Sequence, residues 1–219
     1  MKRQYLLLLA AVSLLSACAG PAGTYKVYWD SITTAFNTPV DAEISLAQVQ
    51  ASRYGLLMVK PGDAPRAVMA LAYLEHGQYK WISADDAMLI TEHGRVVKSL
   101  NLTNDLLFTA ATEPDPLSLD INALIKGASW QRQLDFAQDH QHGIVARSDF
   151  RFQGEESISV LQQNYTTYVV AEQVTFSTDE HSLTNMYWFN KANGKLLRSV
   201  QQPSPSWPVF ELTFLSNAL

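Results

Sequence analysis

Residues 186–202, Met-Tyr-Trp-Phe-Asn-Lys-Ala-Asn-Gly-Lys-Leu-Leu-Arg-Ser-Val-Gln-Gln, show most directly how this chain folds. Two runs rich in aromatic and branched residues, 186–190 and 195–202, flank a polar segment that ends in Asn193-Gly194. Asn-Gly adopts positive φ angles at little cost, so it is a strong signal for a turn between antiparallel strands. The stretch therefore predicts a β-hairpin, with Gly194 at positive φ in a two-residue turn.

Three consecutive aromatic residues, Tyr187, Trp188 and Phe189, must place side chains on both faces of the first strand, because successive side chains alternate. If Tyr187 and Phe189 fill the core, Trp188 faces outward and is a candidate contact for a sugar ring, a lipid or a partner. The reverse arrangement fits the strand period equally well. Trp81, near the middle of another predicted strand, is a second candidate contact, and simple core packing is the alternative for both residues.

Short apolar runs separated by turn residues continue through the rest of the chain. Two Glu-His-Gly segments, 75–77 and 92–94, are typical of hairpin tips. No helical runs alternate with the predicted strands, which argues against parallel βαβ units. We therefore expect a mainly β fold, an antiparallel meander that forms a barrel-like or sandwich domain. The predicted strands are 55–60, 66–74, 78–83, 87–91, 95–100, 144–152, 156–162, 166–177, 186–190, 195–202 and 209–215.

Helical signals are few and short. Apolar residues from Tyr25 to Phe36 follow a helical period up to Pro39, and Ser45 is a possible N-cap for a short helix over 45–53. A third candidate helix, 117–126, overlaps a proline-containing break at 112–120, which we interpret as a loop inside one domain. The prediction is a single mainly β periplasmic domain over 25–219 with a short N-terminal helix.

The first residues form a signal peptide, 1–17. Lys2 and Arg3 precede an apolar run too short to span a membrane, and small residues then precede Cys18, the single cysteine. The segment Leu15-Ser16-Ala17-Cys18 resembles the lipobox of bacterial lipoproteins. This resemblance implies cleavage before Cys18, a diacylglycerol thioether on its sulfur and an acyl chain such as palmitate on its new amine. Residues 18–24 would then be a lipidated tether.

The residue after the cysteine bears on the destination of the protein. Three acyl chains should hold a protein at a membrane almost permanently, since one chain alone binds only marginally. In enterobacterial lipoproteins an Asp directly after the cysteine marks retention in the inner membrane, whereas this chain has Ala19. The resemblance therefore implies the outer membrane, with the domain on its periplasmic face.

Composition narrows the class of partner. Removing Lys2 and Arg3 with the signal peptide leaves 14 of the 16 basic residues against 21 acidic ones, a net charge near −7. This balance argues against nucleic acid as a partner, because nucleic-acid binding needs basic patches. With its one cysteine assigned to lipid, the mature chain has no thiol left for a disulfide.

Signals for catalysis or metal binding are weak. His140 and His142 have the spacing of two strand ligands, but no further cysteine or histidine lies at metal-ligand spacing nearby. No nucleophile elbow, P-loop or dinucleotide fingerprint is present. We therefore expect no enzymatic activity, no metal and no cofactor. Three acidic pairs are the only candidates for glycosidase carboxylates: Asp85-Asp86, Glu155-Glu156 and Asp179-Glu180.

Several short segments beyond the lipobox share one resemblance: Trp81–Asp85, Gly94–Val97, Asn101-Leu102, Asp105-Leu106, Asn185–Phe189, Gly194–Leu196 and Arg198–Gln201. Together these segments resemble the bacterial YjbF/GfcB lipoprotein family. Where that family often has Gly before a Leu, this chain has Asn101 before Leu102. The resemblance implies a mainly β, barrel-like lipoprotein encoded with exopolysaccharide or group 4 capsule secretion genes, and it assigns no catalytic or binding residue.

Three functions are compatible with these observations. The leading expectation is a non-catalytic outer-membrane lipoprotein that assists exopolysaccharide or capsule secretion or assembly, in contact with polysaccharide and other secretion proteins. The alternative is a periplasmic lipid or lipoprotein carrier with an apolar cavity, which unfilled inward-facing apolar residues would indicate. The third is a polysaccharide-modifying hydrolase, which requires two carboxylates that converge in a cleft.

Overall fold

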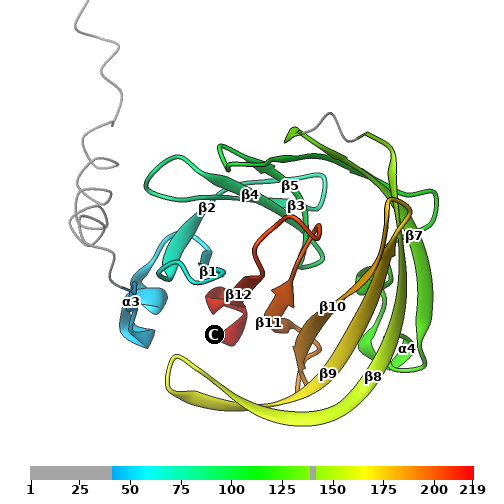
Figure 1. The fold of residues 1–219 in the computed structure, drawn as a ribbon. Coiled ribbons are helices and arrows are strands. Elements are labelled where there is room, and N and C mark those ends of the chain that lie inside the picture. Colours follow the sequence, from blue (N-terminus) through cyan, green and yellow to red (C-terminus); the bar gives the residue numbers. More distant parts are fainter. Residues whose placement is uncertain (1–40, 139–141) are drawn as a thin grey trace, which may run out of the picture. The chain divides into compact units, whose positions relative to one another are not determined.

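The computed structural model describes residues 41–138 and 142–219, which form a twelve-stranded antiparallel sheet (Figure 1). The predicted mainly β, barrel-like fold with a short N-terminal helix is confirmed. The signal peptide, the tether with Cys18 and the helix predicted from Tyr25 to Phe36 lie outside the described residues. The elements are α3 (Leu46–Ala51), β1 (Leu56–Pro61), β2 (Ala67–Glu75), β3 (Gln78–Ile82), β4 (Met88–Glu92), β5 (Arg95–Leu100), β6 (Leu106–Ala110), η2 (Pro116–Ser118), α4 (Ile121–Leu124), β7 (Ala128–Phe136), β8 (Ile144–Val160), β9 (Gln163–Phe176), β10 (Asp179–Asn190), β11 (Leu196–Gln201), β12 (Phe210–Phe214) and η4 (Leu215–Ala218).

The sheet is a meander in which sheet neighbours are also chain neighbours, apart from β1, which pairs with β12. It curls until its two edge strands, β5 and β6, face each other (Figure 1). Side chains bridge this seam: the Leu106 amide donates to Ser99 Oγ at 3.1 Å, and Thr109 Oγ1 donates to the Val97 carbonyl at 2.8 Å. The result is a nearly closed barrel.

The turns confirm the predicted hairpin tips and correct one of them. His76-Gly77 and His93-Gly94 join their strands with positive φ at both residues, as two-residue turns require. Gly194 has the predicted positive φ of 72°, but the predicted two-residue turn is wrong. The strands stop at Asn190 and resume at Leu196, because Asn190 closes a longer loop through its carbonyl, which accepts from the Gly194 amide at 2.8 Å.

Several segments differ from the sequence prediction. Residues 144–152 and 156–162 were predicted as two strands, but β8 runs unbroken to Val160 because Gly154, with φ of 116°, absorbs a bulge. The helix predicted over 117–126 is reduced to η2 and the four-residue α4. Strands β6 and β7 were not predicted, and β10 begins earlier than the predicted strand 186–190. Asn101 has φ of 63°, a conformation that Asn tolerates better than most residues.

Two apolar layers lie on the two faces of the sheet. The larger layer fills the barrel and includes Leu57, Phe136 and Leu212. The smaller layer covers the outer face of the central strands, where α3 and η4 pack over β1 and β11. Ser45 begins α3 with the predicted N-cap, since its hydroxyl accepts from the Gln48 amide and the Gln48 side chain accepts in return from the Ser45 amide.

Candidate functional site

A cluster of buried polar side chains lies inside the barrel, centred on the Glu172 carboxylate of β9. This carboxylate accepts hydrogen bonds from two guanidinium groups, those of Arg95 at 2.9 Å and Arg132 at 3.1 Å. Three neutral side chains also donate to it: Ser148 at 2.5 Å, Asn185 at 2.9 Å and Tyr187 at 2.9 Å. Five donors from four other strands therefore converge on one acidic residue.

A second carboxylate balances the charge of the cluster. Asp115, which caps η2, accepts from Arg95 Nε at 2.5 Å. The Trp130 ring lies under both guanidinium groups, at 4.8 Å from Arg95 and 5.1 Å from Arg132. Two cations thus meet two anions and an aromatic face, the arrangement that makes burial of charge tolerable.

The ionisation of the cluster follows from its geometry. Burial raises the pKa of Glu172, but the charges of Arg95 and Arg132 outweigh burial and hold this pKa well below its ordinary value. Burial lowers the pKa of both arginines. For Arg95, the charges of the two carboxylates outweigh burial and raise its pKa above the ordinary value. For Arg132, repulsion by Arg95 lowers the pKa further, so that it lies below the ordinary value. Burial also raises the pKa of Tyr187. At neutral pH the cluster therefore contains a carboxylate and a neutral phenol.

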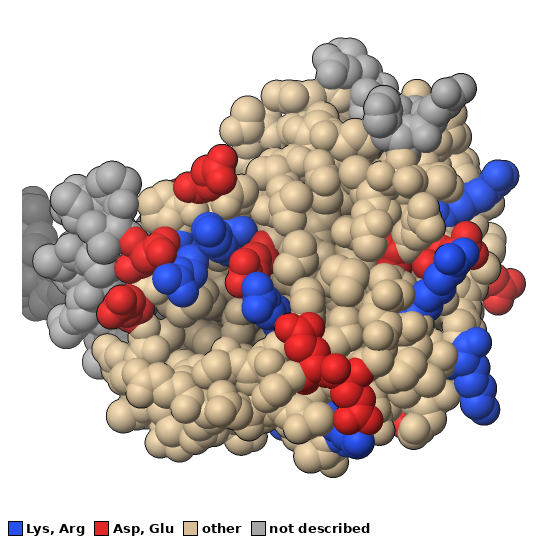
Figure 2. All heavy atoms as spheres, turned by 60° about the horizontal axis from the view of Figure 1, so that its bottom comes forward, with Lys and Arg blue, Asp and Glu red and all other residues tan. Residues whose placement is uncertain are grey.

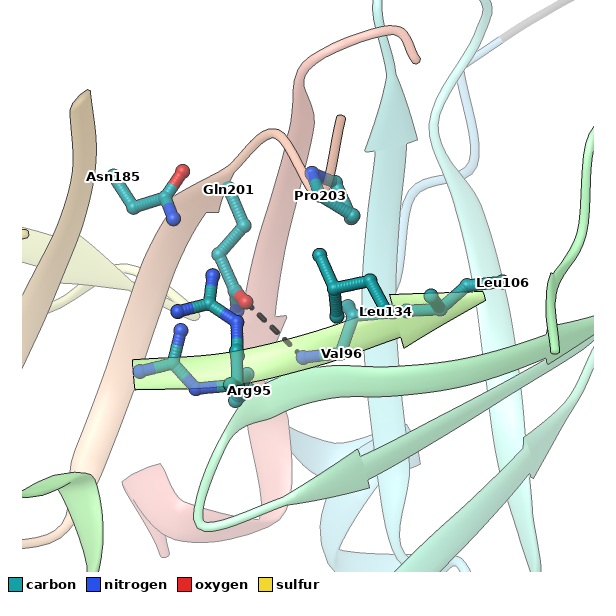
Figure 3. Close-up of a pocket in the computed structure, with 8 residues that line it drawn as sticks. Arg95, Val96, Leu106, Leu134, Asn185, Gln201 and Pro203 are labelled. Carbon is teal, nitrogen blue, oxygen red and sulfur yellow. Dashed lines mark hydrogen bonds between the residues drawn. The ribbon is translucent and has the colours of Figure 1, made fainter. Parts of the chain in front are cut away.

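This cluster has no room for a substrate. The cavity beside it holds about 10 Å³, the space of one water molecule (Figure 3). In the close-up, the Gln201 side chain reaches toward Val96 and accepts from its amide at 3.1 Å. Because the Glu172 oxygens already accept five donors, the carboxylate is unsuited to act as a general base. We interpret the cluster as the polar part of the core, which joins β5, β7, β9 and β10.

A larger cavity of about 550 Å³ opens at one end of the barrel, where the turns at 76–77, 93–94 and 191–195 lie. We call it the mouth pocket. Its size falls within the range of small-molecule sites, about 300–1,000 Å³. The lining comes from β1 to β4, η2, β10 to β12 and η4, and consists of Gly55, Leu56, Leu71, Leu74, Gly77, Tyr79, Trp81, Thr91, His93, Gly94, Leu117, Phe189, Gly194, Leu196, Phe214, Ser216 and Asn217.

Trp81, the second sequence-predicted contact, lines this pocket. Its ring is 4% exposed, and Tyr79 stacks on it with ring centroids 5.9 Å apart and an angle of 13° between the planes. The indole Nε1 of Trp81 donates to Thr91 Oγ1 at 2.9 Å, which fixes the ring. Ligand contact by Trp81 stays a prediction, and the structure places the residue where such a contact is possible.

Trp188 does not provide the exposed platform that the sequence suggested. Tyr187 and Phe189 do point into the barrel, and Trp188 lies on the opposite face, but its ring is only 9% exposed. It belongs to the outer apolar layer, the Arg198 guanidinium lies 5.2 Å from the ring, and its Nε1 donates to Glu156 at 2.8 Å. Strand periodicity could not reveal this cover, because it comes from segments far away in the sequence.

The acidic pairs do not form a catalytic cleft in the described parts of the chain. Glu156 is bonded to Trp188, and Glu155 forms an ion pair with Lys191 at 2.6 Å. Asp85-Asp86 lie in the turn between β3 and β4, and the side chains of Asp179 and Glu180 lie outside the description. His142 is described and lies 3.7 Å from Asp135, whereas His140 is not.

Residues 41–138 and 142–219 contain neither a metal-type cluster of side chains nor a membrane-spanning helix. No three His, Cys, Asp or Glu side chains gather there as a metal site would require. No helix in those ranges is long and apolar enough to cross a membrane. The absence of a metal and of catalysis remains a prediction.

On the face drawn in Figure 2, basic and acidic side chains are interspersed between uncharged areas.

Sequence reasoning missed the buried cluster. The available signal was a charged residue inside an apolar strand, since Glu172 follows Val169-Val170-Ala171 and Arg95 begins the run Val96-Val97. A charge at such a position requires a partner. The partners, however, lie up to 77 residues away, and local periodicity does not identify them.

Comparisons with known proteins agree with the fold. The family model described as "Group 4 capsule polysaccharide lipoprotein gfcB, YjbF" matches residues 29–215. The uncharacterized lipoprotein GfcB of Escherichia coli K12 is 31% identical over 81% of this chain and 83% of its own length. The uncharacterized lipoprotein YjbF of the same organism is 31% identical over 92% and 91%. The crystal structure of the hypothetical lipoprotein YmcC from E. coli K12 matches with a TM-score of 0.71 at 31% identity, covering 83% of this chain and 91% of that one. The chain belongs to the YjbF family of group 4 capsule polysaccharide lipoproteins.

Proposed function

We propose that this protein is an outer-membrane lipoprotein, anchored through Cys18 with its barrel in the periplasm, that assists capsule or exopolysaccharide secretion or assembly. The match of the family model to residues 29–215 carries this proposal, because the family is described as capsule polysaccharide lipoproteins. The lipobox-like sequence before Cys18 supports the anchor, and Ala19 supports the outer membrane.

The proposed role is non-catalytic. In the described residues the strongest concentration of ionisable groups, around Glu172, is sealed and fully hydrogen-bonded. The open cavity, in contrast, is lined by no carboxylate. A protein with this distribution is suited to binding or scaffolding. The hydrolase hypothesis would require that the purified protein shortens the exported polysaccharide, which size-exclusion chromatography measures directly.

Two variants of the anchor test the proposal in the native host. Cys18→Ser removes the acylated sulfur, so we expect the protein to leave the outer-membrane fraction. Ala19→Asp keeps the cysteine but introduces the residue that marks inner-membrane retention, so we expect a lipidated protein in the inner-membrane fraction. Both variants should lower the amount of surface polysaccharide in a strain that lacks the wild-type gene.

Each step of the proposal can fail separately. Normal outer-membrane fractionation of Cys18→Ser would contradict the anchor. Normal surface polysaccharide with Ala19→Asp, once the variant is shown to be in the inner membrane, would contradict the need for an outer-membrane location. Normal polysaccharide in the complete absence of the protein would overturn the secretion role itself.

A further inference from the structure

The mouth pocket is mainly apolar, and His93 is the one lining residue whose side chain can become a cation. None of its seventeen lining residues is Asp, Glu, Lys or Arg, although charged residues make up 17% of the chain. Its larger apolar side chains include those of Leu71, Trp81, Phe189, Leu196 and Phe214. A ligand that carries a charge would lose its hydration here without gaining a partner, so the pocket selects for an uncharged group.

Several polar groups of the lining are already bonded within the protein. Thr91 accepts from Trp81, and Ser216 Oγ accepts from the Leu56 amide at 2.8 Å. Asn217 Nδ2 donates to the Leu196 carbonyl at 2.7 Å. A sugar or a peptide brings many hydroxyl or amide groups that need partners, and these walls offer few. A hydrocarbon needs none.

The rim of the pocket extends this apolar surface into the solvent. Leu74 and Tyr79 pair across β2 and β3, both line the pocket, and their side chains are 59% and 39% exposed. Tyrosine suits a boundary of this kind, because its ring is apolar and its hydroxyl stays in water. An incoming apolar ligand would therefore first contact the exposed side chains of Leu74 and Tyr79 and then reach the buried part of the pocket at Trp81.

We propose that the mouth pocket binds a hydrocarbon chain, the acyl chain of a membrane phospholipid or of a free fatty acid. The volume of about 550 Å³, the uncharged walls and the satisfied polar groups all favour this class of ligand. The inference does not depend on the secretion role. A protein that binds acyl chains but is dispensable for surface polysaccharide would overturn only the proposed function.

Photocrosslinking of the full-length anchored protein tests this binding. The protein is reconstituted into vesicles of phosphatidylethanolamine and phosphatidylglycerol that contain a trace of photoactivatable probe. One arm uses a phospholipid with a photoactivatable palmitoyl chain, and the other uses photoactivatable palmitic acid. After illumination, mass spectrometry of peptides should locate adducts on β2, β3 and β12, and the arm that labels identifies the source of the chain.

Two neighbouring residues of β2 provide a matched pair of variants. Leu74→Glu places a carboxylate on the pocket rim and should lower the labelling of the pocket about tenfold or more. Tyr73→Glu introduces the same charge at a position that is 66% exposed and outside the pocket lining, so labelling should stay within about twofold. Because both side chains are exposed, thermal unfolding should show that both variants remain folded.

The proposal is overturned if the two variants label equally, or if adducts fall only outside the pocket strands. Labelling of that kind would report general contact with the bilayer. It is also overturned if neither probe labels the pocket while the exported polysaccharide, added to the same vesicles, protects pocket residues from a water-soluble footprinting reagent. That outcome would assign the pocket to sugar.

Discussion

The interior cluster and the mouth pocket use the same barrel in opposite ways. Around Glu172 the residues are polar, yet every group meets a partner and little space remains. At the mouth the residues are mostly apolar, yet about 550 Å³ stays unfilled. Apolar side chains normally close-pack, so the unfilled region marks the candidate binding site, and the ionisable region contributes to the structure.

The largest effect should come from breaking the interior cluster. Glu172→Gln leaves Arg95 and Arg132 buried without their shared anion, and we expect the free energy of unfolding to fall by about 3–5 kcal/mol. Urea denaturation measures it. The control is Glu155→Gln, which removes an exposed ion pair with Lys191 and should change stability little. A small loss for Glu172→Gln would show that the charges are not coupled as described.

The Glu172 carboxylate should also make the free energy of unfolding depend on pH. The folded pKa of Glu172 lies below its unfolded value, about 4.3, so its contribution is fully present above that value. It is lost as the pH falls from about 4 toward the lower folded pKa. The stability difference between wild type and Glu172→Gln should therefore be constant from about pH 7 to 5 and shrink below about 4. A difference that stays constant at pH 3 would contradict the depressed pKa.

Alanine substitutions of two glycines in equivalent turns distinguish the cost of backbone strain from the cost of side-chain crowding at the mouth pocket. Gly77 and Gly94 both follow a histidine and have φ of 80° and 87°. A Cβ at Gly77 meets nothing within 4 Å, whereas one at Gly94 would lie 2.1 Å from Leu196 Cδ2. We expect Gly77→Ala to cost about 1 kcal/mol and Gly94→Ala about 2–3 kcal/mol in thermal or urea unfolding. Equal costs would mean that the Leu196 side chain turns into the mouth pocket without penalty.

A smaller effect than that of Gly94→Ala should come from Gly194, which also lines the mouth pocket. Its φ is 72°, and a Cβ there would meet only Ile121, at 3.9 Å. Gly194→Val should therefore cost about 1–2 kcal/mol, from the unfavourable backbone conformation of a branched residue alone. A denaturant melt measures the loss. A neutral substitution would show that the loop from Asn190 to Leu196 relaxes to another shape.

Local features were predictable because their causes are local. The His-Gly turns, the positive φ of Gly194 and the Ser45 cap each depend on a few adjacent residues. Gly154 shows where this reasoning fails, since a glycine that could end a strand instead forms a bulge inside β8. The two-residue turn at Gly194 failed for a similar reason: the side chain of Asn190 accepts from the Ala192 amide and stabilises a longer loop.

The sequence by itself determined the antiparallel meander, the lipobox-like start and the family resemblance, all of which follow from residues close together in the chain. Only the tertiary structure decided that Glu172 joins Arg95 and Arg132, that Trp188 is buried in the outer apolar layer, and that Trp81 lines an unfilled pocket. Strand periodicity specifies which face a side chain occupies. What covers that face depends on how distant strands pair and how far the sheet curls, and hence on contacts across the whole barrel.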